Sequence, residues 1–534
     1  MSEQNWEKIA KAKQATLAES IPSEYRIPKD LLPPDSQLDV TPWPKQSGWF
    51  TEKELEITDS TASTILQKVA SKAWTSEDVT RAFCKRAAAG HQLLNCLTDV
   101  FFDEAIKSAA ALDDHLQRTG KLVGPLHGLP ISLKDNFNVK GKDSTVGFTS
   151  LVDKPAEYNA TLVDILQELG AVRYCKTNVP TAMMIAESVN NTFGRTVNPL
   201  NRALTSGGSS GGESALIAFG GSPLGVGTDI GGSLRIPAAC TGIFTLRPSH
   251  GRFTTQRCRS GLAGQEAVKS VNGPMGRTLE DITMYSKAVI DAKPWLVDPT
   301  MLPMPWQPVE PKQKLKIAVM WNDGICTPTP PVTRALKDTV QKLKNAGHEL
   351  VDWDPKHLHL KALQLLGRMF VADGGKSVEA LLKPTGEPWR PEMKTYEDAT
   401  ELGTYDMWKL HLERTELQRQ YLEQWMSYDG LDAILCPTTP YSTVKHGDFK
   451  YVGYTGVYNV VDYSATSFPS GITVDKAVDL PASDYKAQSE FCQAAHDSYD
   501  PEAVHGMPVS LQLVAKRLEE EKVLAMTATV LKAL

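Results

Sequence analysis

Several features that mark particular classes of protein are missing from this sequence of 534 residues. It contains no run of eighteen apolar residues, so we expect no membrane-spanning helix. The first residues, MSEQNWEKIAKAKQ, are charged and have no apolar stretch of the kind found in secretory signals. The final Leu-Lys-Ala-Leu is not the Ser-Lys-Leu peroxisomal address. We therefore expect a cytoplasmic protein.

Paired cysteines and an excess of basic charge are missing as well. The eight cysteines are scattered with no Cys-x-x-Cys, which favours reduced thiols over a disulfide framework or a metal site. The net charge is −6, from 57 basic and 63 acidic residues that are interspersed along the chain. This pattern predicts neither a nucleic-acid partner nor binding to an anionic membrane surface.

The N-terminal region differs in composition from the rest of the chain. Residues 1–20 are predicted to form a helix, and residues 21–49 hold six prolines and two tryptophans. Proline at this density opposes both helix and sheet, so we expect an extended arm lying on the body of the protein. We assign residues 1–60 to this helix and arm, and residues 61–534 to one main domain whose motif region is 125–250.

Strand and helix signals then alternate, which is typical of an α/β fold. A buried strand is expected within residues 125–137, whose sequence is PLHGLPISLKDNF. We expect it to be followed by a helix that is capped by Asn159 and ends at Leu169, and then by a strand over 171–175. This spacing predicts βαβ units and a parallel or mixed sheet. Later strands are expected at 314–320, 431–440 and 507–514, helices at 333–346, 360–428 and 519–531, and loops over 441–500.

The segment Thr205–Pro237 carries the chemistry, because its 33 residues hold ten glycines and six serines. Two tight turns, Gly207–Gly212 and Gly231–Ser233, bracket a helical stretch at 213–219. Glycine is required where the backbone adopts positive φ or approaches another group closely. We expect a pocket walled by backbone N–H groups with serine hydroxyls projecting into it.

Three side chains could form a hydrolytic set that needs no histidine. Lys134 ends an apolar strand, and burial would lower its pKa from about 10.4 toward the ~7–8 useful for a base. The alternative is a Lys134 that pairs with a carboxylate or extends to solvent. Ser209 and Ser233 lie in the glycine turns, where a base could activate one serine and successive N–H groups could bind an oxyanion.

Two rival motifs occur in the same segment. Gly208–Gly212 satisfies Gly-x-Ser-x-Gly, with Ser210 as the nucleophile of an α/β-hydrolase and His496 or His505 as its histidine. A phosphate-binding loop would need Gly-Lys-Ser/Thr after the glycines, but Glu213 follows Gly212. The first remains an alternative, and the second fails.

The order and spacing of these motifs resemble the amidase signature family. The resemblance rests on Leu-Pro-Ile-Ser-Leu-Lys-Asp, Gly-Gly-Ser-Ser-Gly-Gly-Glu and Gly-Thr-Asp-Ile-Gly-Gly-Ser-Leu-Arg-Ile-Pro, and it extends from about residue 60 to the C-terminus. The Pro- and Trp-rich arm and the length are similar to those of stand-alone fungal acetamidase-like enzymes or general amidases. The resemblance implies a single α/β/α domain around a large mixed sheet.

The resemblance also implies a role for each motif residue. Lys134 would be the general base, Ser209 a proton-relaying serine in a cis peptide, and Ser233 the nucleophile. The remaining positions are the oxyanion-hole amides of Ile230, Gly231, Gly232 and Ser233, the supporting residues Ser210, Asp229 and Arg235, and the substrate-binding Met183. No metal or organic cofactor is implied.

The function expected from this set is hydrolysis of a small-molecule carboxamide through an acyl-enzyme. Carbamates or esters could be cleaved by the same acyl chemistry. The second hypothesis is a glutamine-dependent amidotransferase subunit with a tight partner, and the third is a binding protein without activity. A homodimer is the assembly expected on general grounds.

Overall fold

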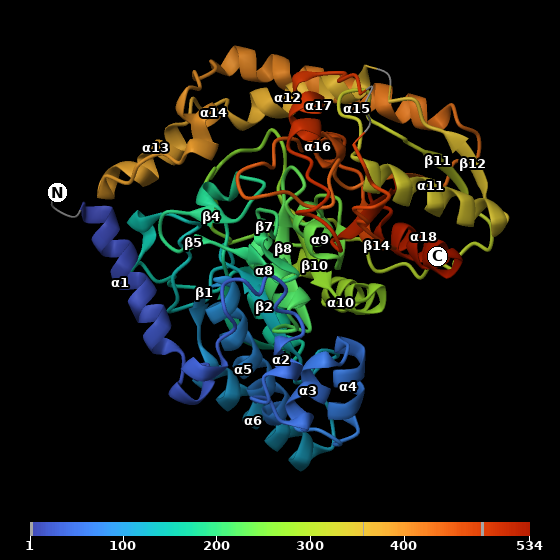
Figure 1. Ribbon diagram of the computed structural model, residues 1–534. Coiled ribbons are helices and arrows are strands. Elements are labelled where there is room, and N and C mark those ends of the chain that lie inside the picture. Colours follow the sequence, from blue (N-terminus) through green and yellow to red (C-terminus); the bar gives the residue numbers. More distant parts are fainter. Residues whose placement is uncertain (1–3, 356, 482–484) are drawn as a thin grey trace.

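The computed structural model describes residues 4–355, 357–481 and 485–534. Its centre is an 11-stranded mixed sheet (Figure 1). In sheet order the strands are β1 (Leu97–Val100), β3 (Val172–Thr177), β2 (Pro130–Lys134), β8 (Leu224–Asp229), β10 (Val271–Gly276), β9 (Phe244–Arg247), β14 (Ala465–Thr473), β15 (Pro508–Val514), β13 (Ala433–Pro437), β11 (Lys316–Val319) and β12 (Glu349–Asp352).

Strand pairing makes the sheet mixed. β2 runs parallel to β3 and β8, and β11 runs parallel to β12 and β13. The other pairs in the sheet are antiparallel. Two small antiparallel sheets lie outside it, formed by β4 (Val189–Asn190) with β5 (Gly194–Arg195) and by β6 (Val197–Asn198) with β7 (Asn201–Thr205). Most strands of the large sheet are buried, as in sheets covered by helices on both faces, whereas the edge strand β12 is half-buried to exposed.

Helices cover both faces of the sheet. On one face α8 (Gly211–Ala218) and α9 (Arg235–Thr241) contact each other and the central strands. On the other face α10 (Leu279–Asp291), α11 (Pro330–Asn345) and α18 (Glu520–Ala533) pack against the sheet, and α18 contacts both α10 and α11. The short helix α7 (Thr161–Glu168) contacts β3. This is the α/β/α arrangement that the resemblance implies.

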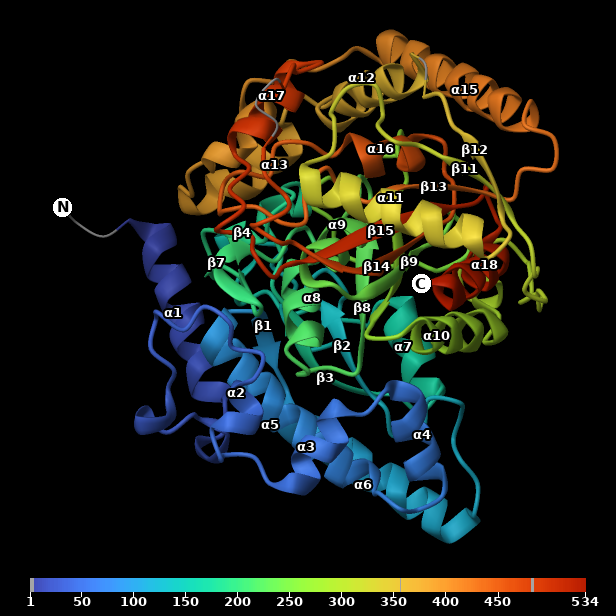
Figure 2. The same ribbon diagram turned by 45° about the vertical axis from the view of Figure 1, so that its right-hand side comes forward.

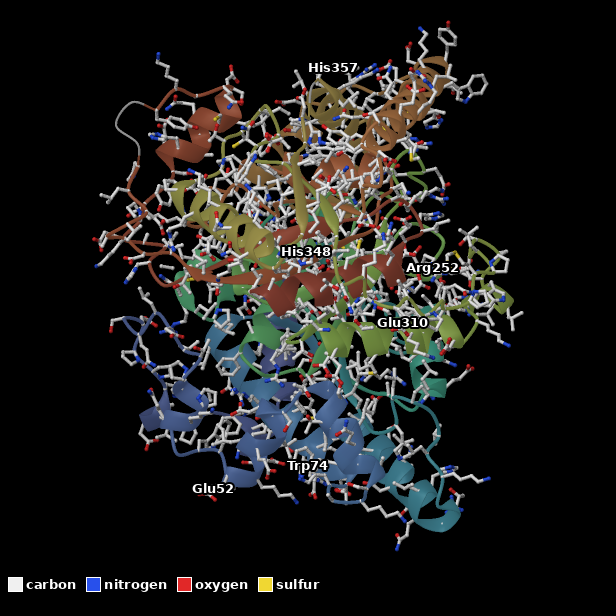
Figure 3. The ribbon with its side chains drawn as sticks, turned by 90° about the vertical axis from the view of Figure 1, so that its right-hand side faces the viewer. Glu52, Trp74, Arg252, Glu310, His348 and His357 are labelled. Atoms are coloured by element: carbon white, nitrogen blue, oxygen red, sulfur yellow. The ribbon has the colours of Figure 1, made fainter. Side chains whose placement is uncertain are left out.

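Further helices gather at the two ends of the molecule (Figures 1 and 2). At one end are α2 (Trp43–Gln46), α3 (Glu52–Asp59), α4 (Ala62–Ala70), α5 (Ser76–Leu94) and α6 (Phe102–Thr119), and α1 (Asn5–Ser20) runs along the side. At the other end are α12 (Leu358–Phe370), α13 (Lys376–Leu382), α14 (Lys394–Glu397), α15 (Thr404–Met426), α16 (Gly453–Val460) and α17 (Glu490–Asp497). Figure 3 shows Glu52 and Trp74 at the first end and His357 at the second.

Most of the expected elements are confirmed, and two expectations are wrong. Asn159 does not cap α7: the capping position is Ala160, and Asn159 instead accepts from the Lys140 amide (2.8 Å) and donates to Asp164 (2.7 Å). Residues 441–500 are not only loops, because they include α16, the central strand β14 and α17. Within the described ranges, no helix is long and apolar enough to cross a membrane.

Candidate active site

Strand β2 carries Lys134 into the interior of the protein. The strand is apolar and buried along its whole length, and Lys134 at its end is 0% exposed. Its Nζ lies 2.7 Å from Ser209 Oγ and 2.7 Å from Thr228 Oγ1. Burial lowers the pKa of Lys134 to about 7, against the opposing effect of Asp229 and Glu213. No carboxylate forms an ion pair with this ammonium in the described part of the chain, so the paired alternative is not observed.

Ser209 lies in the turn before α8, where the chain passes very close to its neighbours. The Gly208–Ser209 peptide is cis. A Cβ on Gly208 would lie 2.6 Å from both the Glu187 nitrogen and the Ile185 oxygen, so only glycine fits there. Ser209 itself is 1% exposed. The turn therefore directs a buried hydroxyl onto the Lys134 nitrogen.

Ser233 differs from the other serines of the motif because solvent reaches it. From 204 to 241 every residue is buried except Ala218, Ile230, Gly231 and Ser233, which are half-buried. The Ser233 carbonyl accepts the Ser210 amide (3.2 Å), which holds the two glycine turns together. The described structure contains no hydrogen bond between the Ser209 and Ser233 hydroxyls. The second turn thus presents one accessible hydroxyl beside a buried lysine–serine pair.

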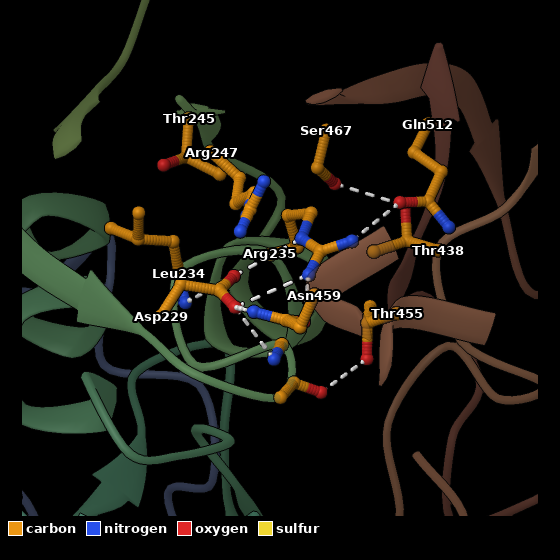
Figure 4. A network of polar contacts seen from close by, with 12 residues as sticks. Asp229, Leu234, Arg235, Thr245, Arg247, Thr438, Thr455, Asn459, Ser467 and Gln512 are labelled. Carbon is orange, nitrogen blue, oxygen red and sulfur yellow. Dashed lines mark hydrogen bonds and ion pairs between the residues drawn. The ribbon is translucent and has the colours of Figure 1, made fainter. Parts of the chain in front are cut away.

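A buried ion pair supports the Ser233 turn (Figure 4). Asp229 ends β8 and accepts from the amides of Gly232 (2.7 Å) and Leu234 (3.2 Å). Arg235 Nε donates to the same carboxylate (3.0 Å), as does Asn459 (2.8 Å). Burial alone would raise the Asp229 pKa, but Arg235, Arg247 and Asn459 lower it to about 2. Asp229 is therefore ionised and fixes the turn.

These contacts reduce the number of backbone amides available to the expected oxyanion hole. The Gly232 amide is occupied by Asp229 Oδ1, so it does not face an incoming substrate. Within residues 4–355, 357–481 and 485–534, the amides of Ile230, Gly231 and Ser233 have no hydrogen-bond acceptor. Three of the four expected donors are thus free, and the fourth is committed to the support of the turn.

Helix α16 also supports the Ser233 turn. Thr455 Oγ1 donates to the Gly231 carbonyl (2.8 Å), a contact also drawn in Figure 4. Gly232 has φ +131°, and a Cβ there would collide with the Thr455 hydroxyl and with Ile236. Gly232 is consequently required both by its backbone conformation and by this close approach.

Apolar side chains lie beside the Ser233 turn. A Cβ placed on Gly231 would lie 3.3 Å from the ring of Phe370, at the end of α12. Met183, the expected substrate contact, is half-buried with φ +60° and belongs with Phe370 to one cluster of apolar side chains. Phe370 also lines a cavity of about 370 Å³, together with Leu262, Met369 and Met407.

The α/β-hydrolase alternative finds no support in the geometry. The Ser210 hydroxyl is buried against β8, where it bonds to the Thr228 backbone (3.3 Å). His496 stacks on Tyr485 at 4.0 Å, and His505 lies 3.2 Å from the Val474 carbonyl. Neither histidine contacts Ser210 within the described residues. Ser210 is instead part of the scaffold under the turns.

Residues that sequence reasoning did not identify also shape this site. Thr455 and Asn459 come from α16, in a stretch expected to be loop, so no sequence signal placed them near Ser233. Gln512 on β15 accepts from Arg235 Nη1 (3.3 Å). Glu213 also lies close to the site, and the sequence signal for it is a charged residue within a glycine-rich motif. Among the described residues, no group of three or more His, Cys, Asp or Glu could hold a metal ion.

Comparisons with known proteins show similarity along nearly the whole chain. A sequence profile of the amidase family matches residues 78–524. An acetamidase of Emericella nidulans is 40% identical, with 99% of this chain and 98% of that protein covered. An acetamidase of Aspergillus oryzae is 38% identical with both chains covered completely (100%). The solved structure of a fatty acid amide hydrolase matches with a TM-score of 0.94 and 35% identity, covering 98% of this chain and 94% of that chain.

The profile match includes the lysine strand, both glycine turns and the ion pair below them. The relatives extend the similarity to nearly the full length of the chain. On this evidence the chain belongs to the amidase family and is a hydrolase that acts on amides.

Proposed function

We propose that this enzyme hydrolyses small carboxamides through an acyl-enzyme on Ser233, with Ser209 as proton relay and Lys134 as base. The observation that carries the proposal is the 2.7 Å contact between the buried Lys134 nitrogen and Ser209, beside the one accessible serine of a buried motif. A lysine whose pKa is about 7 is half neutral at neutral pH and can accept a proton.

In the acylation step, neutral Lys134 takes the Ser209 proton while Ser209 takes the Ser233 proton. The Ser233 oxygen attacks the amide carbonyl, and the negative charge on the carbonyl oxygen is stabilised by the amides of Ile230, Gly231 and Ser233. Lys134 and Ser209 then return the proton to the leaving nitrogen, and the carbon–nitrogen bond breaks. Water attacks the ester by the same relay and releases the carboxylate. The Ser209–Ser233 contact would tighten when substrate binds.

The proposed substrate class rests on the relatives. Two relatives are named acetamidases and the similar solved structure is a fatty acid amide hydrolase, so the family includes small and large acyl groups. Carbamates and esters are the alternative substrates, since the acyl chemistry is the same. An amidotransferase subunit would need a partner chain and glutamine, so release of ammonia from simple amides by the purified chain alone would exclude it.

The first experiment is intact-mass spectrometry after exposure to a fluorophosphonate probe. We expect one adduct on wild type and on Ser214→Ala, a buried serine of α8 outside the relay, and none on Ser233→Ala. In the same variant kcat should fall by about 10⁴-fold or more while circular dichroism stays native. An adduct that survives in Ser233→Ala but disappears in Ser210→Ala would move the nucleophile to Ser210.

A further inference from the structure

Glu213 is a buried carboxyl to which the proposed mechanism assigns no role. It is the third residue of α8, four residues after Ser209, and it is 0% exposed. Its neighbours are hydroxyl groups: Oε1 contacts Ser132 Oγ, and Oε2 accepts from Thr177 Oγ1 at 2.6 Å. No basic side chain forms an ion pair with it within the described part of the chain. A buried carboxylate without a cation is costly, so its retention needs a reason.

The contacts of Glu213 surround the strand position of Lys134. Ser132 precedes Lys134 by two residues, which places both side chains on the same face of β2. Thr177 is the residue of β3 that pairs with Lys134 across the two parallel strands. One carboxyl group therefore joins the helix that follows Ser209 to the strand of Lys134 and to the neighbouring strand.

The space for this carboxyl is provided by the neighbouring strand. Gly225 of β8 pairs with Ser132, and a Cβ on it would overlap Glu213 Oε1 and crowd the Ser132 hydroxyl. The N-terminal turn of α8 adds partial positive charge, which favours an ionised carboxylate. Ser132 also lies 2.9 Å from Ser222 Oγ, so the hydroxyl that contacts Glu213 is itself held in place.

Glu213 and Lys134 both have pKa values near neutrality. Burial raises the Glu213 pKa to about 7, although the hydrogen bonds from Ser132 and Thr177 and the charge of Lys134 lower it. The charge of Asp229 on β8 also raises the Lys134 pKa, but Asp229 has a pKa of about 2 and stays ionised. The groups near Glu213 on and beside β3 stay protonated, because burial raises the pKa values of Tyr174, Cys175 and Cys96.

We propose that Glu213 is a positioning residue for the base, whose carboxyl is anchored to the strand positions around Lys134 and supplies the buried counter-charge for the lysine proton. The inference rests on the proposed role of Lys134. When Lys134 takes the Ser209 proton, its nitrogen becomes an ammonium in a dry site, and the Glu213 carboxylate stabilises that charge. No covalent bond to Glu213 forms or breaks.

The direction in which a Glu213 substitution shifts the pH profile of kcat/KM follows from charge alone. Lys134 is active when neutral, so kcat/KM rises with pH through its pKa of about 7. A neighbouring negative charge favours the ammonium and raises this pKa, so removing the charge lowers it. Glu213→Gln should therefore move the acidic limb of the pH profile by about one unit toward lower pH. Above the limb, the weaker base should reduce kcat/KM by less than about tenfold.

The experiment compares pH profiles of kcat/KM for p-nitroacetanilide in wild type, Glu213→Gln and a control, Glu387→Gln. Glu387 is also buried, is also held by a threonine hydroxyl (Thr149, 2.7 Å), and has a pKa that burial raises. It exerts no resolved effect on Lys134. We expect an acid shift in Glu213→Gln and no shift in the control.

A second variant covers the case in which Glu213→Gln does not fold. Thr177→Val keeps the carboxyl but removes the hydroxyl that favours its ionised form, and should shift the limb in the same direction by less. An unchanged limb in the folded variants, a shift toward higher pH, or an equal shift in Glu387→Gln would each overturn the proposal. Failure of the proposed function would be recognised separately. In that case the fluorophosphonate probe would still label Ser233→Ala, and this readout does not involve Glu213.

Discussion

Asp229 is ionised in a fully buried position because several donors share its charge. Its two oxygens accept from two backbone amides, a guanidinium and an amide side chain, all directed at the turn before α9. A buried ion pair contributes little net stability, but removing one partner leaves an uncompensated charge. At the scale of the residue, Asp229 is therefore expected to act through the shape of the Ser233 turn.

Replacing Asp229 by Asn should separate this role from general stability. We expect kcat to fall by about 10²–10³-fold, because the turn that carries the oxyanion amides loosens. The free energy of unfolding should fall by about 3–5 kcal/mol, since Arg235 loses its partner. Asp462→Asn is the control, because Asp462 also pairs with a buried arginine, Arg247 (3.0 Å), but makes no hydrogen bond to the turn within the described residues. A kcat for Asp229→Asn within threefold of wild type would contradict the argument.

Helix α16 shows how an element with weak local preference becomes ordered by its surroundings. Its sequence, GYTGVYNV, contains two glycines and two valines, which disfavour helix. All eight of its residues are nevertheless buried, and it packs against α12 and beneath the Ser233 turn. Its helical form is therefore decided by tertiary packing, and it in turn provides Thr455 and Asn459.

Thr455→Val tests the contribution of this helix to the turn. The substitution preserves shape but removes the hydroxyl that donates to the Gly231 carbonyl. We expect a loss of about 1 kcal/mol in the free energy of unfolding, the usual value of one hydrogen bond. Steady-state kinetics should show a severalfold fall in kcat with little change in KM. Thr339→Val is the control, because the Thr339 hydroxyl on α11 is buried with no partner among the described residues. Equal losses of kcat in both variants would remove the link between α16 and the turn.

At the scale of the whole molecule, the N-terminal arm shares the main core. Leu17, Tyr25, Val40 and Trp43 belong to the same buried cluster as the strands around Lys134. Trp43 packs 6.0 Å from the Trp49 ring, and its Nε1 donates to the Leu31 carbonyl (2.9 Å). Proline-rich segments of this kind become ordered only when their apolar side chains are buried against a partner surface. The boundary near residue 60 remains a prediction about folding.

Trp43→Ala measures how strongly the arm is coupled to the rest of the protein. The cavity should lower the free energy of unfolding by about 3–5 kcal/mol, with kcat unchanged at a temperature where the variant is folded. We expect a single shifted transition in thermal unfolding, because arm and sheet share one core. Trp408→Ala on α15, where the side chain is 63% exposed, should change stability by less than about 0.5 kcal/mol. A separate early transition in Trp43→Ala would show that the arm melts independently.

Some features were determined by the sequence because they depend on local chemistry. Thr75 caps α5 through the Asp78 amide (3.0 Å), and Gly120 ends α6 with φ +66°, as their residue types predict. The strand of Lys134 was recognisable because an apolar run around a single lysine is locally unusual. The glycine turns were recognisable because few other residues tolerate their backbone conformations and close approaches.

Other features were decided only by the tertiary structure, because they join segments distant in sequence. Asn459 reaches Asp229 across 230 positions, and Glu213 reaches Ser132 across 81. Nothing local indicates that α16 is helical. The sequence by itself thus determined which side chains could do the chemistry and the two turns that carry the serines. Packing alone decided which helix supports the Ser233 turn and which charges lie near the base, because burial and long-range contacts control both.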